Sequence, residues 1–254
     1  MTVLLLGDIT GRSRVALRML SAVLEACGHE VLMLPTALIS NTLNLGRHEA
    51  LDTTDYLLRS LKTWWELGIR YDLAYVGYIT GMAQANTLCS VIDDLHEQGV
   101  HVVLDPIMGD NGKKYNSVTQ EQAEGFRLLM QKADILTPNL TEAGLLLGMD
   151  SSIYDAVEMA RMLSHEKRGV LITSARNAAG QDAVIGYDPE CGEIELRFER
   201  VPGHHWGTGD LFTGLMMNGL LRGMTLEMAA KEAALHVEAQ LCGREKSLLP
   251  EQSV

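Results

Sequence analysis

The sequence predicts an α/β fold with three layers, in which helices cover both faces of a mostly parallel central sheet. Short apolar runs, typical of buried strands, alternate with longer segments whose apolar residues recur at every third or fourth position, as in helices. Repeated units of strand, loop and helix indicate a parallel sheet, because parallel neighbours need a crossover connection. Ligands bind such sheets beyond the carboxyl ends of the strands, so we expect functional side chains directly after the apolar runs.

The strands of the first half are predicted by continuous apolar runs, which are typical of strands buried on both faces. These runs are Val3–Leu6, Val31–Leu34, Leu73–Val76 and His101–Leu104. The helices between them are predicted over residues 15–27, 53–67 and around 88–95 from apolar residues at helical spacing. Gly28 ends the first helix. Residues 38–46 form a predicted loop that carries Ser40 and is a candidate wall of a substrate site.

The second half continues the alternation and then changes pattern. Thr119 and Gln122 have the spacing of a capping box, which predicts a helix from there to about residue 131. Further strands are predicted at Ile135–Leu136 and Val170–Ile172, and further helices at residues 142–147, at 155–167, and after Gly209 and Thr225. Residues 183–187 and 194–198 flank a turn of Asp, Pro and Gly, which predicts a hairpin.

Length and composition are those of an ordinary globular enzyme or binding protein. A chain of 254 residues is long enough for one large α/β domain, and we expect a single domain over residues 1–254. Hydrophobic residues make up 46% and charged residues 21%. The net charge of −12 argues against nucleic acids and anionic membranes as partners, because both require a basic surface. An anionic cofactor would depend on backbone amides, a few cations or a divalent metal.

The cysteines and the start of the chain predict a cytoplasmic location. Cys27, Cys89, Cys191 and Cys242 lie far apart and have no histidine at metal-ligand spacing, so they indicate neither a disulfide framework nor a zinc site. Reduced thiols are the expectation. The apolar run at residues 3–6 lacks a basic region and is too short for a signal peptide, and no later run approaches a membrane span.

The segment Gly207-Thr208-Gly209-Asp210 directly precedes apolar residues at helical spacing, so its amides are expected at a helix N-terminus. Such amides attract anions, and glycine lets the backbone approach a phosphate closely. Asp210 is unsuited to binding phosphate but suited to accept the proton of a hydroxyl that attacks a γ-phosphoryl group, while the amides stabilise the developing charge. The alternative is an ordinary loop in which Asp210 only offsets the helix dipole.

Acidic residues that follow the fourth apolar run predict a metal site. Neither common nucleotide-binding fingerprint occurs in the sequence, so ATP would bind in another way. Asp105 and Asp110 follow the end of a predicted buried strand, and carboxylates there can hold Mg²⁺ directly or through water. The alternative is a solvated turn, because Asp, Asn and Gly favour turns.

The next strand end repeats this arrangement. Thr137 and Asn139 flank a proline, and Glu142 lies on the first turn of the following helix. Each residue alone could be a helix cap or an acid that offsets the helix dipole. Together with Asp105 and Asp110 they predict a binding site for metal and phosphate. Thr173 and Ser174 offer two hydroxyls at another predicted strand end, suited to phosphate or ribose.

Taken in order and spacing, these segments resemble the ribokinase-like vitamin kinases, and within them the pyridoxal kinases. The segments are Asp105–Asp110, Thr137–Glu142, Ile172–Ser174 and Gly207–Asp210. Leu34–Thr36 with Ser40 and Asn41 resembles the substrate loop, and Gly77-Tyr78 resembles its neighbour. The resemblance therefore extends over nearly the whole chain.

The resemblance implies ATP-dependent phosphorylation of the 5′-hydroxymethyl group of pyridoxal, pyridoxine or pyridoxamine by a homodimer. It also implies Mg²⁺, and a monovalent cation is a further candidate cofactor. By the family pattern Asp210 is the base and residues 207–209 form the anion hole. Asp105, Asp110 and Glu142 would serve Mg²⁺ and phosphate, and the nucleotide would be lined by Asp105, Thr137, Asn139, Glu142, Thr173 and Ser174. The substrate would contact Asp8, Thr36, Ser40, Tyr78 and Asp210.

The chain departs from the family pattern in two places. Asp8 stands where many relatives have serine, and the loop after it is shorter. His204 and His205 before the glycines could contact phosphate when protonated, or could be exposed loop residues.

Two other functions compete with a B6 vitamer kinase: a hydroxymethylpyrimidine kinase of thiamine biosynthesis, and a non-catalytic ligand-binding protein on the same fold.

Overall fold

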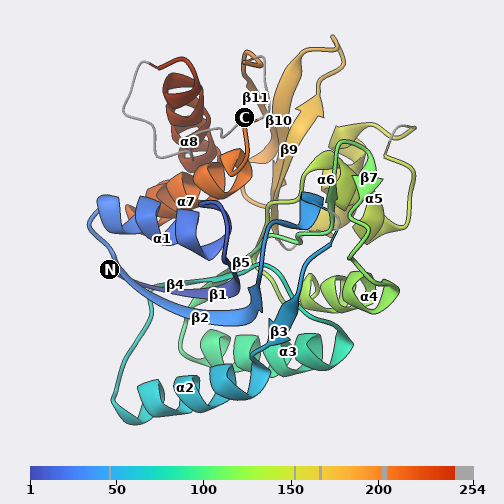
Figure 1. Cartoon of the computed structure of the whole chain (residues 1–254). Coiled ribbons are helices and arrows are strands. Elements are labelled where there is room, and N and C mark those ends of the chain that lie inside the picture. Colours follow the sequence, from blue (N-terminus) through green and yellow to red (C-terminus); the bar gives the residue numbers. More distant parts are fainter. Residues whose placement is uncertain (46, 152, 166–167, 202–204, 244–254) are drawn as a thin grey trace.

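A nine-stranded sheet runs through the molecule in the order β11-β10-β9-β8-β5-β4-β1-β2-β3 (Figure 1). The computed structural model describes residues 1–45, 47–151, 153–165, 168–201 and 205–243. The strands are β1 (Thr2–Thr10), β2 (Glu30–Ile39), β3 (Ala50–Asp52), β4 (Leu73–Val76), β5 (His101–Leu104), β8 (Ile135–Leu136), β9 (Gly169–Arg176), β10 (Asp182–Asp188) and β11 (Gly192–Arg197). Strands β3, β10 and β11 pair antiparallel, and the other pairings in the sheet are parallel.

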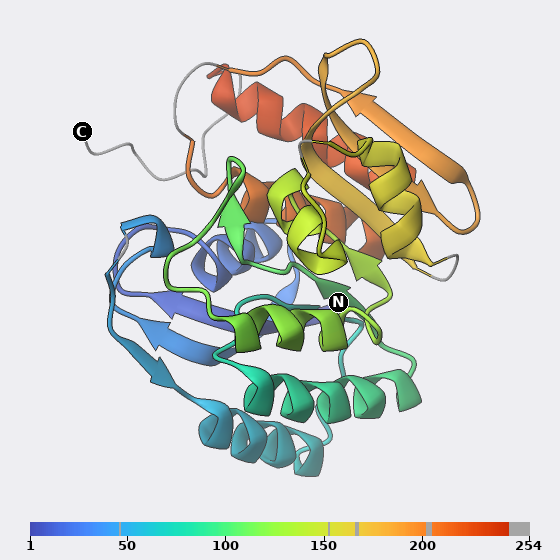
Figure 2. The ribbon, with the colours of Figure 1, turned by 90° about the vertical axis from the view of Figure 1, so that its right-hand side faces the viewer.

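Helices cover both faces of this sheet, which confirms the predicted three-layer α/β class. One face carries α1 (Leu17–Ala26), α7 (Thr208–Leu221) and α8 (Leu226–Leu241). The other carries α2 (Thr54–Glu66), α3 (Met82–Glu97), α4 (Gln120–Leu129), α5 (Leu140–Leu147) and α6 (Ala156–Ser164). In Figure 2, α2, α3 and α4 lie one above another on their face. A separate ribbon pairs β6 (Gly109–Asp110) with β7 (Lys113–Lys114).

Strand β1 is covered on both faces, which explains why polar residues do not alternate with its apolar ones. Val3 and Leu5 pack among the residues of α1, α7 and α8, whereas Leu4 and Leu6 pack on the opposite face. Successive side chains of a strand point to opposite faces, and here both faces are covered. All four side chains are fully buried. The strand is therefore held from both sides, and its carboxyl end is a rigid platform for the residues that follow.

Several predicted boundaries were wrong, because pairing partners extend elements beyond their apolar signal. Strand β1 continues through Gly7 and Asp8 to Thr10, with a register shift against β2 between those two residues. Strand β2 reaches Ile39, inside the loop expected at residues 38–46, of which residue 46 lies outside the described part. The exposed β3 and the short β6–β7 ribbon lack a hydrophobic pattern and were not predicted.

Strand β9 also differs from its prediction. We expected it to end at Ile172, but it runs on to Arg176 because β10 pairs with its last residues. Ser174 therefore lies within the strand, in the left-handed region at φ 56°. Helix α6 ends at Ser164, short of the expected 167, and residues 166–167 lie outside the described part. The hairpin of β10 and β11 is confirmed.

The capping box at Thr119 is confirmed. Its hydroxyl accepts the amide of Gln122 at 3.2 Å, and Gln122 Oε1 accepts the amide of Thr119 at 2.8 Å. Two otherwise unsatisfied donors at the start of α4 are thereby paired.

Among the described residues, no helix has the length and apolar character needed to cross a membrane.

Candidate active site

The carboxyl ends of five neighbouring parallel strands meet at one edge of the sheet. Strands β1, β4, β5, β8 and β9 are adjacent, so the residues that follow them lie side by side. Asp105 follows β5, Thr137 follows β8, and a parallel bridge joins Asn139 to Thr173 of β9. The predicted site residues of these segments, far apart in sequence, thus share one edge.

Four carboxyl groups gather at this edge, and we call Asp8, Asp105, Glu142 and Asp210 the acidic cluster. The charges of Glu142, Asp210 and Asp8 all raise the pKa of Asp105, which places them near it. Asp210 likewise raises the pKa of Asp8. The first turn of α7 therefore reaches the residues at the ends of β1 and β5, as the sequence-based hypothesis required.

Asp210 lies on the first turn of α7, where the chain enters the helix through Gly207. Gly207 has a φ of 80°, a conformation that glycine adopts without strain, and no side chain caps the helix. A Cβ at Gly209 would meet no atom within 4 Å. The first amides of a helix have no intrahelical acceptor, so this end offers donors beside open space. The predicted helix N-terminus is confirmed.

The Asp210 carboxylate is anchored by another element. Its Oδ2 accepts the backbone amide of Ala16 at 2.9 Å, just before α1 begins. This bond explains why α1 begins at Leu17 rather than at residue 15, since the Ala16 amide is held outside the helix at φ 51°. Burial raises the pKa of Asp210 to about 6, and the Ala16 amide opposes that rise. The group is mostly ionised near neutral pH and can accept a proton.

Glu142 and Asn139 fasten the loop after β5 to the start of α5. Glu142 Oε1 accepts the amides of Met108 at 3.0 Å and Gly109 at 3.5 Å, while Oε2 accepts the amide of Asn139 at 2.9 Å. Asn139 caps the helix through the Glu142 amide and donates to the Gly109 carbonyl at 2.7 Å. Both side chains therefore have structural roles, and their contacts with nucleotide or metal remain predictions.

The pair of Asp105 and Glu142 suits a cation. Burial, and then the charge of Glu142, raise the pKa of Asp105 well above its usual range, and burial likewise raises that of Glu142. Mg²⁺ needs only one or two carboxylates when waters and phosphate oxygens complete its shell. Asp110 is exposed and accepts the amide and side chain of its neighbour Asn111. In the described part of the chain no three His, Cys, Asp or Glu side chains are placed to hold a metal.

The hydroxyl groups predicted for the nucleotide and for the anion hole are in different environments. Thr137 is 3% exposed, and its Oγ1 has no hydrogen-bond partner within the described structure. Thr173 lies against Pro138, whose carbonyl accepts its amide at 2.9 Å. Ser174 is exposed. Thr208 donates to the carbonyl of His205 at 3.1 Å, and His204 lies outside the described residues.

The residues predicted to contact the substrate lie on the β1–β2 side of the edge. Thr36 is fully buried, and its hydroxyl donates to the Tyr78 carbonyl at 2.6 Å. Tyr78 is 4% exposed and packs with Ala37, Ile39 and Leu43. Ser40 is exposed at the end of β2 and accepts the amide of Glu49 at 3.0 Å. Asp8 is the charged member of this group, and it is buried.

Burial of Asp8 predicts a pH-dependent stability. Burial, and then the Asp210 charge, raise the pKa of Asp8 from 3.8 to about 7, which is worth about 4 kcal/mol. Because the folded-state pKa is raised, this stabilising contribution is complete below pH 3.8 and is lost as pH rises through about 7. Without ligands, the free energy of unfolding should therefore fall between these values, and less so in Asp8→Asn. Denaturant titrations at several pH values test this, and parallel pH profiles of the two proteins would contradict it.

Tyr75 is a residue of this site that the sequence did not reveal. It lies within the apolar run of β4 and is 1% exposed. Its hydroxyl has no hydrogen-bond partner of standard geometry in the described structure, but it lies close enough to the Asp105 carboxyl group to lower the pKa of that group. Burial raises the pKa of the hydroxyl, as do the charges of all four members of the acidic cluster. A Cβ at Gly77 would lie 2.7 Å from this hydroxyl. The glycine after the strand is the only signal in the sequence, and it does not identify the tyrosine.

Removing the unpaired hydroxyl should not weaken the ligand-free fold. A buried polar group without a partner costs about 1–3 kcal/mol, so Tyr75→Phe should unfold at the same or a higher denaturant concentration. Tyr71→Phe is a matched control, because that hydroxyl is also buried and unpaired but lies outside the acidic cluster. A loss of more than about 1 kcal/mol in Tyr75→Phe would show that the hydroxyl has a partner in solution.

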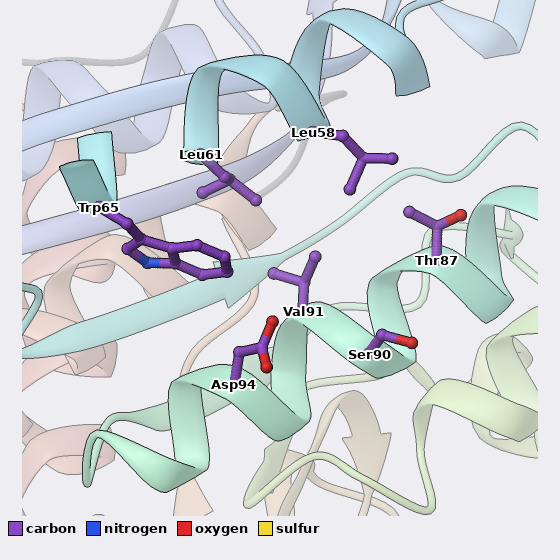
Figure 3. Close-up of a pocket in the computed structure, with 7 residues that line it drawn as sticks. All are labelled: Leu58, Leu61, Trp65, Thr87, Ser90, Val91 and Asp94. Carbon is purple, nitrogen blue, oxygen red and sulfur yellow. The ribbon is translucent and has the colours of Figure 1, made fainter. Parts of the chain in front are cut away.

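A surface groove between α2 and α3 lies apart from this edge (Figure 3). Leu58, Leu61 and Trp65 of α2 face Thr87, Ser90, Val91 and Asp94 of α3 across it. None of these residues follows a strand end or belongs to the acidic cluster, so the groove is not the candidate active site.

Known proteins share this fold. A crystal structure with pyridoxal, of a Bacteroides thetaiotaomicron protein classed with the phosphomethylpyrimidine kinases, matches with a TM-score of 0.82 and 30% identity, over 92% of this chain and 85% of that one. A pyridoxine/pyridoxal/pyridoxamine kinase of Bordetella bronchiseptica is 30% identical over 85% of this chain and 79% of its own length. A kinase of the same name from Bordetella avium is 35% identical over 66% of this chain.

These matches define a ribokinase-like α/β protein, as the resemblance predicted. The family model described as phosphomethylpyrimidine kinase matches residues 53–248, and the chain belongs to that family. The chain spans 60% of the Bordetella avium kinase and about half the length of several other curated pyridoxal kinases.

Proposed function

We propose that this protein is a kinase that transfers the γ-phosphoryl group of ATP to the 5′-hydroxymethyl group of a vitamin B6 vitamer. One observation carries the proposal: Asp210 is held on the first turn of α7, within the acidic cluster and beside helix amides that no side chain of the described residues caps. The relatives named as pyridoxine/pyridoxal/pyridoxamine kinases support the choice of substrate. The vitamers meant are pyridoxal, pyridoxine and pyridoxamine.

Asp210 is the general base of the proposed reaction. Its carboxylate takes the proton of the hydroxymethyl group as the oxygen forms its bond to the γ-phosphorus, and the bond to the leaving ADP oxygen breaks. The bond from the Ala16 amide to Oδ2 fixes the carboxylate and leaves Oδ1 without a hydrogen-bond partner in the described structure. The amides of residues 207–209 donate to the phosphoryl oxygens, where negative charge develops.

Asp105 and Glu142 would hold Mg²⁺, with the exposed Asp110 at its outer side. Bound there, the ion would neutralise charge on the phosphate oxygens. The charge of Glu142 raises the pKa of Asp105, and a cation bound between the two buried carboxylates would relieve this repulsion. The hydroxyls of Thr137, Thr173 and Ser174, with Asn139, would line the nucleotide, and a monovalent cation is a further candidate.

A substrate panel tests the proposal. ADP release should be measured by a coupled assay with pyridoxal, pyridoxine, pyridoxamine and hydroxymethylpyrimidine, each with and without Mg²⁺. We expect turnover of the three vitamers to exceed that of the pyrimidine. The description of the family model favours the pyrimidine as second candidate, and its preferential turnover would establish that function instead. Tight vitamer binding without any ADP release would identify a non-catalytic binding protein.

The proposal extends to a homodimer in the cytoplasm. Light scattering on the purified protein measures the oligomeric state directly, and a monomeric mass at assay concentration would contradict the proposed dimer. Cell fractionation would test the cytoplasmic location in the same way.

A further inference from the structure

The ring of Tyr75 runs along β4 towards the edge of the sheet that carries the acidic cluster. Its hydroxyl lies over the residue that follows the strand, because a Cβ at Gly77 would be 2.7 Å from the hydroxyl oxygen and 2.9 Å from Cε1. On the neighbouring strand, a Cβ at Gly7 would be 3.6 Å from the same Cε1. The absence of a side chain at Gly77 therefore lets the hydroxyl reach the end of the strand.

The pairing register places Asp105 beside this hydroxyl. Tyr75 pairs with Val103 of β5, and both pack on the face that α1, α7 and α8 cover. Gly77 and Asp105 come two residues later on the two chains, so by alternation they lie on that same face. The Asp105 amide donates to the carbonyl of Val76 at 2.9 Å, which keeps the two strand ends in register. The effect of the hydroxyl on the pKa of Asp105 agrees with this placement.

The hydroxyl is a donor without an acceptor of standard geometry in the described structure. Buried tyrosine hydroxyls usually have a partner, and the Tyr75 side chain is 1% exposed. Phenylalanine would fill the same space without the cost of an unpaired polar group. The hydroxyl is therefore unfavourable in the ligand-free protein, and we expect it to find its acceptor when the site is occupied.

An occupied metal site would supply that acceptor. Carboxylates bind metal ions in their ionised form, which only accepts hydrogen bonds, and outer residues commonly donate to them. Asp105 is one of the two buried carboxyl groups that suit a cation, and it is the one beside the hydroxyl. A donor at this place would restrict the rotation of the carboxylate and so favour cation binding.

We propose that Tyr75 is a positioning residue, whose hydroxyl donates to the Asp105 carboxylate when that carboxylate binds the divalent cation. This inference rests on the proposed function, and it adds a residue that orients one of the proposed metal ligands. Tyr75 acts through Asp105 and has no contact with the reacting atoms.

Binding of Mn²⁺ tests this role without turnover. Mn²⁺ takes the same oxygen ligands as Mg²⁺, and the EPR signal of the free ion reports how much is bound. The titrations contain ADP, whose phosphate oxygens help to complete the shell of the ion, and a blank without protein corrects for Mn²⁺ held by ADP alone.

Three variants are compared with the wild-type protein. Tyr75→Phe removes only the hydroxyl, and Asp105→Asn removes the charge of the proposed ligand. Tyr71→Phe is the matched control, because Tyr71 lies before the amino end of the same strand and its buried hydroxyl is also unpaired in the described structure. Thermal unfolding without ligands shows that each variant is folded.

The relative affinities decide the inference. We expect Tyr75→Phe to weaken Mn²⁺ binding about 10- to 100-fold, the usual effect of losing a partner of a metal ligand. Asp105→Asn should weaken it at least as much, and Tyr71→Phe should leave it unchanged. In turnover assays, the Mg²⁺ concentration that gives half the maximal rate should rise in Tyr75→Phe, while kcat at saturating Mg²⁺ should stay close to that of the wild type.

Several results would overturn the inference. They are wild-type Mn²⁺ affinity in Tyr75→Phe, wild-type affinity in Asp105→Asn, and equal losses in Tyr75→Phe and Tyr71→Phe. A higher KM for the vitamer with an unchanged Mg²⁺ dependence would also overturn it, because the hydroxyl would then act on the substrate.

The proposed function is judged separately, by turnover of the wild-type protein. If that protein phosphorylates none of the vitamers, the proposed function fails, and the Mn²⁺ titrations still decide the role of Tyr75. If it phosphorylates them while Tyr75→Phe keeps the wild-type Mn²⁺ affinity, only the role of Tyr75 fails.

Discussion

Replacing Asp210 with asparagine is expected to lower kcat by a factor of about 100 or more while leaving the fold and nucleotide binding nearly intact. Asparagine cannot take the proton of the attacking hydroxyl, so the step loses its base. It does keep an oxygen that can accept the Ala16 amide, now paired with Asp210 Oδ2 at 2.9 Å. Steady-state kinetics with pyridoxal and ATP, and nucleotide affinity by calorimetry, provide the measurements. Near-normal turnover would remove the assignment of the base.

Alanine at the same position is the informative comparison. Asp210→Ala also removes the acceptor of the Ala16 amide, so we expect it to lose about 1–3 kcal/mol of stability that the asparagine variant keeps. Similar kcat values for the two variants, with different stabilities, would separate the chemical role of the carboxylate from its structural one. A kcat that followed stability would instead assign Asp210 a purely structural role.

The pH dependence of kcat/KM gives an independent check on the base. Burial raises the pKa of Asp210 to about 6, so the ionised form, which accepts the proton, is lost as pH falls through that value. We expect kcat/KM to decrease on the acid side of about pH 6. An activity unchanged well below that pH would exclude Asp210 as the base.

The sequence predicted the layers of the fold because both faces of the parallel strands are covered. Leu4 and Leu5 are buried on opposite faces, so the strand has a continuous apolar run that is unmistakable even at four residues. The boundaries were harder, because they depend on partners distant in sequence. The end of β9 is fixed by its pairing with β10, and the start of α1 by a carboxylate from α7. No local pattern contains that information.

The site was predictable where function needs a polar residue directly after an apolar run. Asp105 has this pattern, whereas Asp210 directly precedes the apolar residues of a helix, and the structure places the two near one another. Tyr75 could not be found in this way, because a tyrosine inside an apolar strand is an ordinary core residue in sequence. Thr36 is a polar residue that was predicted to contact the substrate, but its hydroxyl donates a hydrogen bond to the carbonyl of Tyr78. The sequence does not reveal this bond, because the two residues meet only in the folded chain.

Glu142 is expected to give the largest stability effect of the site residues. Glu142→Ala leaves the amides of Met108, Gly109 and Asn139 without their acceptor, and unsatisfied buried donors cost about 1–3 kcal/mol each. Removing a buried acid relieves repulsion with Asp105, which offsets part of this cost. We expect a net loss of about 3 kcal/mol in the free energy of unfolding, measured by denaturant titration.

Two further variants show whether the loss comes from the hydrogen bonds. Glu142→Gln has one carbonyl oxygen, which can serve either the amides of the loop after β5 or the amide of Asn139, so it should lose less stability than alanine. Thr119→Ala is the control, because it removes the hydroxyl that caps α4 away from the acidic cluster and leaves the bond from Gln122 to the Ile79 carbonyl in place. If the loss in Glu142→Ala is no larger than in Thr119→Ala, the carboxylate only caps a helix. A larger loss means that Glu142 also holds the loop that carries Asp110 against α5.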